Sequence, residues 1–124
     1  FQPHMHGLGA YQCLELIYPS EGATAKTELI SCANWDYNWH TIYNYADDVA
    51  PLVPAGTVGH IISYMDNTDN NPGNHDARNW TGDGPRTIDE MAFSWLGWYS
   101  MTDDQYLAEI ERRNSMSDIA SADD

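Results

Sequence analysis

The chain has 124 residues, enough for one hydrophobic core but not for two. Its 19 acidic residues against 5 Lys plus Arg give a net charge of −14, which excludes nucleic acids and anionic membrane surfaces as partners. Because 42% of the residues are hydrophobic and 12% aromatic, we expect the chain to fold. No apolar run is long enough to span a bilayer.

The chain begins with a histidine pair, His4 and His6, in Phe1-Gln2-Pro3-His4-Met5-His6. Side chains of an extended segment alternate between two faces, so both imidazoles would lie on one face. Two adjacent imidazoles form a ready pair of metal ligands. The alternative is two surface histidines at the start of a strand. The start at Phe1 indicates either a processed chain or a piece of a longer one.

The next segments predict a β-hairpin. Tyr11–Tyr18 alternates apolar and polar residues, with Leu14, Leu16 and Tyr18 on one face. Pro19-Ser20-Glu21-Gly22 reads as a turn, and Lys26–Cys32 as the returning strand. We therefore expect two neighbouring antiparallel strands.

Two cysteines, Cys13 and Cys32, fall on these strands. They would form one disulfide in a secreted protein, or remain two buried thiols; the sequence leaves both readings open. Asn79-Trp80-Thr81 is a glycosylation acceptor pattern, which is meaningful only in a glycosylating secretory pathway. We expect a secreted, periplasmic or extracellular protein.

Three further segments predict strands: Trp35–Tyr43, Val58–Met65 and Thr87–Met101. The aromatic face of the first should close the core, with a carbohydrate platform as the alternative. The last should be a central strand entered through a short acidic turn. Many short strands predict an all-β fold, an antiparallel β-sandwich over residues 1–101.

A terminal helix is predicted from about Asp103 to Asn114, followed by an acidic tail, so that residues 102–124 form a separate part. Thr102 and Gln105 match a capping box. Asp103 and Asp104 in the first turn, and Arg112-Arg113 near the expected end, would complement the helix dipole.

The segment from Asp66 to Pro85 consists almost wholly of Asp, Asn, Gly, Pro and Arg, and we expect a hydrated surface loop. Oxygen donors between Asp66 and Asp76 make calcium a candidate ligand here. Their spacing does not match the calcium loop of helix-loop-helix proteins. The donors are Asp66, Asn67, Asp69, Asn70 and Asp76.

The third ligand of a metal site with His4 and His6 is expected to be Met91, in Thr87-Ile88-Asp89-Glu90-Met91. Cys13 and Cys32 lack the spacing of a zinc knuckle. A thioether partner indicates copper instead, because soft sulfur favours Cu(I).

Several segments occur in the order found in one known family. They are His4-Met5-His6, Trp35-Asp36-Tyr37-Asn38-Trp39 with Thr41 and Tyr43, Pro54-x-Gly56-Thr57, Asp66-Asn67-Thr68, Thr87-x-Asp89-Glu90-Met91 and Trp98-Tyr99. Over Phe1–Tyr99 the chain resembles the C-terminal domain of the type II copper, ascorbate-dependent monooxygenases, which include peptidylglycine α-hydroxylating and dopamine β-monooxygenases. The bacterial members with a Pro-His-Met-His motif are the most similar.

The resemblance implies a jelly-roll-like β-sandwich in which His4, His6 and Met91 bind the copper that activates dioxygen for C–H hydroxylation. It implies that Asp89 and Glu90 contact the ligands and orient them without binding the metal, or simply form an acidic turn. It also implies a partner, either a separate three-histidine copper domain that donates electrons or a small reductant such as ascorbate.

The chain departs from this family in two respects. His40, His60 and His75 are too scattered to rebuild the electron-donor centre, so we expect core or surface roles for them. Phe93 and Trp95 replace polar and tyrosine positions that hold a peptide substrate, which argues against peptide amidation.

The alternative function is a non-catalytic copper- or calcium-binding structural module of an extracellular assembly, one that self-associates.

Overall fold

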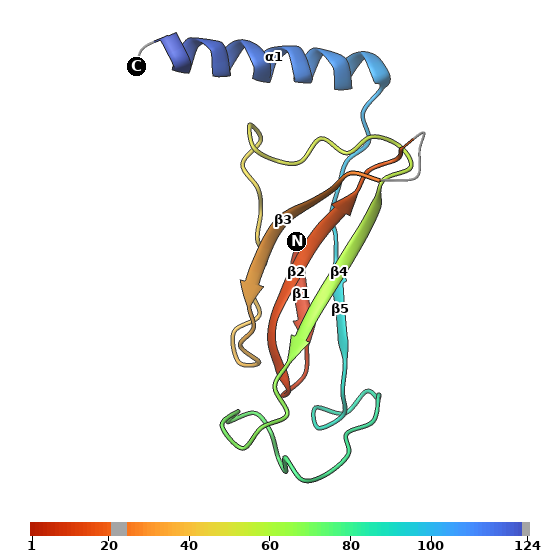
Figure 1. Ribbon diagram of the computed structural model, residues 1–124, viewed down its shortest axis with the longest axis vertical. Coiled ribbons are helices and arrows are strands. Elements are labelled where there is room, and N and C mark those ends of the chain that lie inside the picture. The colour runs from red at the N-terminus through yellow and green to blue at the C-terminus, as the bar shows by residue number, and fades with distance from the viewer. Residues whose placement is uncertain (21–24, 123–124) are drawn as a thin grey trace. The chain divides into compact units, whose positions relative to one another are not determined.

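The computed structural model describes residues 1–20 and 25–122 of the chain (Figure 1). The strands form two antiparallel sheets, and a helix follows them, which confirms the predicted all-β sandwich with a C-terminal helix. The jelly-roll order of strands stays a prediction. The elements are β1 (Gln2–Met5), β2 (Gly9–Ile17), β3 (Thr27–Asn34), β4 (Val58–Met65), β5 (Ala92–Trp95) and α1 (Asp103–Ala122).

The larger sheet has the strand order β3-β2-β4, with β2 in the centre. The predicted hairpin of β2 and β3 is present, although its turn lies partly outside the described residues. Leu14 and Leu16 share a buried face of β2, as their alternation predicts, and the fully buried Gln12 lies on the same face. Buried apolar side chains of this face stabilise the unit through the hydrophobic effect.

The cysteines form a disulfide between β2 and β3. Cys13 and Cys32 lie directly opposite each other in the register, with their Cα atoms 4.1 Å apart. This separation is slightly shorter than that of a directly opposed, non-hydrogen-bonded pair on antiparallel strands. Of the two readings that the sequence left open, the disulfide is therefore the one observed.

The smaller sheet consists of β1 and β5, the first and last strands of the chain. Its register pairs Gln2 with Trp95, His4 with Phe93 and Met5 with Ala92. Burial alternates along β1, since Pro3 and Met5 are buried whereas Gln2 and His4 are half-buried. The odd-numbered residues of β1 therefore face the core, and His4 faces the opposite way.

The predicted central strand Thr87–Met101 is wrong in length and in place. Only Ala92–Trp95 is a strand, and it pairs with β1 in the two-stranded sheet. Its beginning is delayed because Arg86 and Asp89 form a tight turn, in which the Asp89 N–H donates to the Arg86 carbonyl at 2.9 Å. Beyond the strand, Trp98 is 82% exposed, so it does not belong to the core.

The predicted strand Trp35–Tyr43 is also wrong. The Asp36 side chain accepts the N–H of Asn38 at 2.8 Å, and the Asp36 carbonyl accepts the N–H of Trp39 at 3.0 Å. An aspartate that satisfies the backbone two residues ahead favours a turn over a ladder. The ring of Trp39 is 74% exposed and does not close the core.

The chain divides into two compact units. The first contains both sheets and comprises Phe1–Asn44 and Val53–Leu96; the second comprises Tyr45–Leu52 and the chain from Gly97 onward, including α1. Within the described residues, no helix combines the length and apolarity needed to cross a membrane.

Helix α1 begins with the predicted capping box. The Thr102 N–H donates to the Gln105 side chain at 2.9 Å, and the Gln105 N–H donates to the Thr102 hydroxyl at 3.3 Å. The predicted end at Asn114 is wrong, because the following residues contain no Gly or Pro and the helix continues to Ala122.

Because α1 continues, Arg112 and Arg113 lie in its middle, where they bind Glu109 rather than complement the dipole of the C-terminus. Arg113 also donates to the backbone carbonyls of Ala50 and Asp47, both at 2.8 Å. These bonds tie the helix to the segment Tyr45–Leu52 of its own unit.

We expect acid to weaken α1 through Glu109. Hydrogen bonds from Arg112 and Arg113 lower the pKa of Glu109 from 4.5 to about 2. A depressed carboxylate pKa stabilises the folded unit above the unfolded pKa, and the contribution is lost as the pH falls from 4.5 to about 2. Far-UV circular dichroism should show a smaller acid-induced loss of helicity in Glu109→Gln than in wild type.

Glu111→Gln is the matched control on the same helix, because no ion pair of Glu111 is present among the described residues. It should keep the wild-type acid response. An equal reduction of the response in both variants would contradict the role given to Glu109.

Candidate metal centre

The three residues predicted to bind metal lie on one face of the β1–β5 ladder. The ladder continues one residue past Met5 and Ala92, because the His6 N–H donates to the Met91 carbonyl at 3.2 Å. Directly opposed residues of antiparallel strands point to the same face, and so do residues two apart. His4, His6 and Met91 therefore share one face of the ladder, opposite to the face of Pro3 and Met5.

A backbone carbonyl fixes the ring of His6. Its Nδ1 lies 3.0 Å from the carbonyl oxygen of Asp89, and the residue is 6% exposed. A carbonyl can only accept, so Nδ1 carries the proton and Nε2 keeps its lone pair. This arrangement is typical of metal-binding histidines, whose other nitrogen is held by a carbonyl or carboxylate.

The acidic residues before Met91 have separate structural roles. The Asp89 carboxylate accepts hydrogen bonds from Arg86, the shortest at 2.6 Å, and these bonds lower the pKa of Asp89. Glu90 accepts the N–H of Met91 at 3.3 Å, whereas its burial raises its pKa. Asp89 thus orients His6 through its carbonyl while its carboxylate holds the turn.

Five rings surround His4, and one of them is the ring of His6, whose centroid lies 5.5 Å away. The centroid of its ring lies 4.6 Å from that of Phe93 and 5.6 Å from that of Trp95, both on β5. It lies 5.8 Å from the ring of Trp35 and 5.7 Å from that of His40. The position of His40 could not be predicted from the sequence, because an irregular segment brings this residue to the site.

Burial lowers the pKa of His4, and the neighbouring His6 and His40 lower it further. The lowered pKa favours the neutral imidazole. Neutral imidazole is the form that binds a metal ion. The electrostatics of the site therefore suit a ligand role for His4.

The segment with Trp35 and His40 closes the edge of β1 that β5 leaves free. Successive residues of a strand direct their N–H and C=O groups to opposite edges. His6 bonds to β5, so the backbone of Phe1, an odd number of residues away, points to the other edge. There Phe1 exchanges two hydrogen bonds with Tyr43, at 2.9 and 3.0 Å.

The donor set that remains for a metal combines nitrogen and sulfur. Across residues 1–20 and 25–122, no group of three or more His, Cys, Asp or Glu side chains is arranged to hold an ion. His60 binds Glu15 on the surface, and His75 is exposed, as expected for both residues. Met91 stays the predicted third ligand of the histidine pair; two imidazoles with one thioether would suit copper.

The loop proposed for calcium uses its oxygen atoms internally. The side chains of Asp66, Asn71, Asn74 and Asp76 each accept the N–H two residues ahead, at 2.9–3.2 Å. Such turns explain why the segment is rich in Asp and Asn. A calcium site between Asp66 and Asp76 stays a prediction without a converging donor group in this part of the described chain.

Comparison of the chain with protein-family models, curated proteins and solved structures gave no match.

We expect His6 to occupy the Nδ1–H tautomer when neutral, because the Asp89 carbonyl accepts only from a protonated Nδ1. Long-range ¹H–¹⁵N correlation NMR distinguishes the two tautomers. His75 is the internal control, since no hydrogen bond of its ring is present within the described residues. A predominant Nε2–H tautomer at His6 would contradict the geometry and remove Nε2 as a ligand atom.

Proposed function

We propose that the chain is a mononuclear copper-binding domain of the kind that forms the oxygen-activating half of type II copper monooxygenases. The observation that supports the proposal is the shared face of His4, His6 and Met91 on the β1–β5 ladder. The family resemblance of the sequence assigns the same three residues as ligands.

His4 and His6 would bind copper through imidazole nitrogens, and Met91 through its thioether. Bound copper would supply dioxygen activation for hydroxylation of a substrate C–H bond. The Asp89 carbonyl holds the His6 ring, and the Trp35 indole N–H donates to the His6 carbonyl at 3.2 Å. These bonds preorganise the site, because they fix the ring and its backbone before metal binds.

The side chains of β5 beside His4, where a substrate would lie, are aromatic rather than polar. Phe93 and Trp95 are 37% and 51% exposed beside His4, and neither can accept a hydrogen bond from a peptide. This favours a substrate other than a peptide amide. Catalysis would require electrons from a separate donor domain or a small reductant.

A non-catalytic copper-binding module is the second candidate. It is favoured because the described residues contain one candidate centre and no second cluster that could serve as an electron donor. Both candidates suit a secreted, periplasmic or extracellular protein, because the Cys13–Cys32 disulfide persists in oxidising compartments.

We expect one copper per chain, and a Cu(I) affinity that falls about tenfold or more in Met91→Ala, since loss of the thioether removes the soft ligand. The affinity is measured by competition with a chromogenic Cu(I) chelator under reducing conditions. Met65→Ala is the control, because Met65 is a half-exposed methionine at the end of β4.

Absence of copper binding by wild type, with Cu(I) supplied, would refute the proposal. Ascorbate-dependent oxygen consumption by the copper-loaded chain separates the two candidates, because the non-catalytic module predicts none above free copper.

A further inference from the structure

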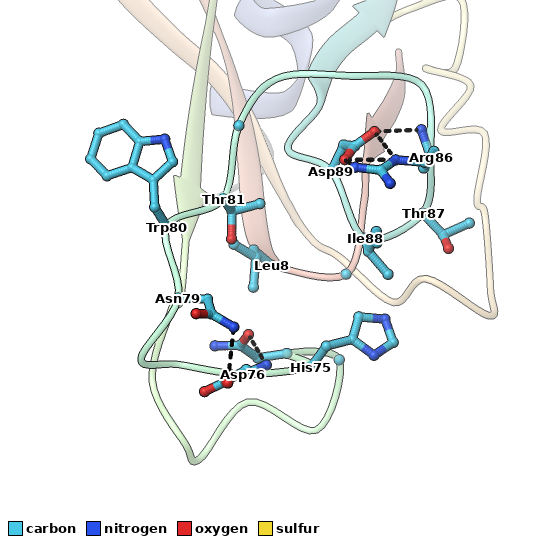
Figure 2. A pocket seen from close by; sticks show the side chains of 14 residues that line it. Leu8, His75, Asp76, Asn79, Trp80, Thr81, Arg86, Thr87, Ile88 and Asp89 are labelled. Atoms are coloured by element: carbon cyan, nitrogen blue, oxygen red, sulfur yellow. Dashed lines mark hydrogen bonds and ion pairs between the residues drawn. The ribbon is translucent and has the colours of Figure 1, made fainter.

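A pocket of about 220 Å³ lies beside the candidate metal centre, between the Gly7–Leu8 segment and the loop from Gly73 to Asp89 (Figure 2). Leu8 and Ile88 supply apolar surface, and Asn79, His75 and Thr81 supply polar groups. The volume is below that of pockets for drug-sized ligands, so the pocket suits a small molecule or one unit of a larger one.

The walls of the pocket are fixed before any ligand enters. The Asn71 side chain donates to the carbonyls of Gly7 and Asp66, at 3.1 and 2.7 Å. The backbones of Gly7 and Gly73 lie so close that a Cβ atom on either would collide with the other's carbonyl oxygen. A preorganised wall lowers the ordering cost of binding.

The charged groups in the lining are already paired. Asp76 binds Arg78 at 3.0 Å and accepts a hydrogen bond from Asn79 at 2.9 Å. Asp89 binds Arg86 in the same way, as the dashed lines in Figure 2 show. No carboxylate of the lining is left for a cation, and the net charge of −14 disfavours an anion. The pocket therefore suits a neutral ligand.

The lining also contains two hydroxyls and one imidazole, which can each form hydrogen bonds with a ligand. Within the described residues, no hydrogen bond is made by the side chains of Thr81, Thr87 or His75. A hydroxyl both donates and accepts, so these groups suit a ligand that carries hydroxyls. An entirely apolar ligand would bury the same groups without partners, at a cost in binding free energy.

We propose that this pocket binds a neutral, hydroxyl-rich ring, the pyranose unit of a saccharide. The hydroxyls of such a ring match Thr81, Thr87 and His75, and its apolar C–H face matches Leu8 and Ile88. Trp80 is 94% exposed and its ring points away from the pocket in Figure 2, so it takes no part. The site is distinct from the copper ligands and does not depend on copper.

The test is a ¹H–¹⁵N NMR titration of the whole chain with methyl β-D-glucopyranoside. We expect saturable shifts at the amides of Gly73, Gly82 and Ile88. Thr81→Val, which replaces a hydroxyl by a methyl group of similar size, should weaken binding about twofold to twelvefold, the effect of one neutral hydrogen bond. The spectra also report whether each variant remains folded.

Thr27→Val on β3 is the matched control and should leave the affinity unchanged, because Thr27 is exposed and outside the pocket. Met91→Ala should also leave it unchanged, which separates this site from the proposed copper centre. Linear, non-saturating shifts, equal weakening in Thr27→Val, or saturable binding of inorganic phosphate instead of the pyranoside would each overturn the proposal.

A free sugar and the end unit of a glycan share this chemistry, and a titration with cellotetraose distinguishes them. Binding at least as tight as that of the monosaccharide assigns the pocket to a glycan end, whereas weaker binding assigns it to a free sugar.

Discussion

The pairing of β1 with β5 is the constraint on which the candidate centre depends. It joins residues more than eighty positions apart, and its register decides which side chains share a face. Pro3 and Met5 turn to the core, so His4 must turn outward, and the bond from His6 to Met91 carries the same alternation one step further. A slip of one residue would move Met91 to the other face and separate it from the histidines.

Asp89 connects the two sites described in the first unit. Its carboxylate is held by Arg86 at the pocket, and its carbonyl holds the His6 ring at the metal face. The turn that separates these groups also sets where β5 begins. One short segment, Arg86 to Met91, therefore determines the edge of the pocket, the orientation of the His6 ring and the position of Met91 opposite His6.

The sequence was sufficient wherever local pattern decides structure. The period of two predicted β2 and the shared face of His4 and His6. The Pro and Gly residues before Val58 marked the loop that leads into β4, and the capping box predicted the start of α1. Prediction from the sequence failed where a local turn competes with a strand, as at Asp36 and Asp89. The side chains of these residues accept hydrogen bonds from nearby backbone N–H groups, so the turn needs no partner strand. The contact of His40 with His4 was not predictable, since it depends on a non-local path of the chain.

The β1–β5 pair also has a consequence for synthesis of the protein. β1 is synthesised well before its partner β5 and cannot pair until β5 has been made, and such long-range contacts form slowly. During that interval Phe1 and Met5, which are buried at the end of folding, remain uncovered on an unpaired edge. The unpaired β1 is therefore most prone to aggregation before β5 has been translated, and a chaperone that shields β1 would help the protein most.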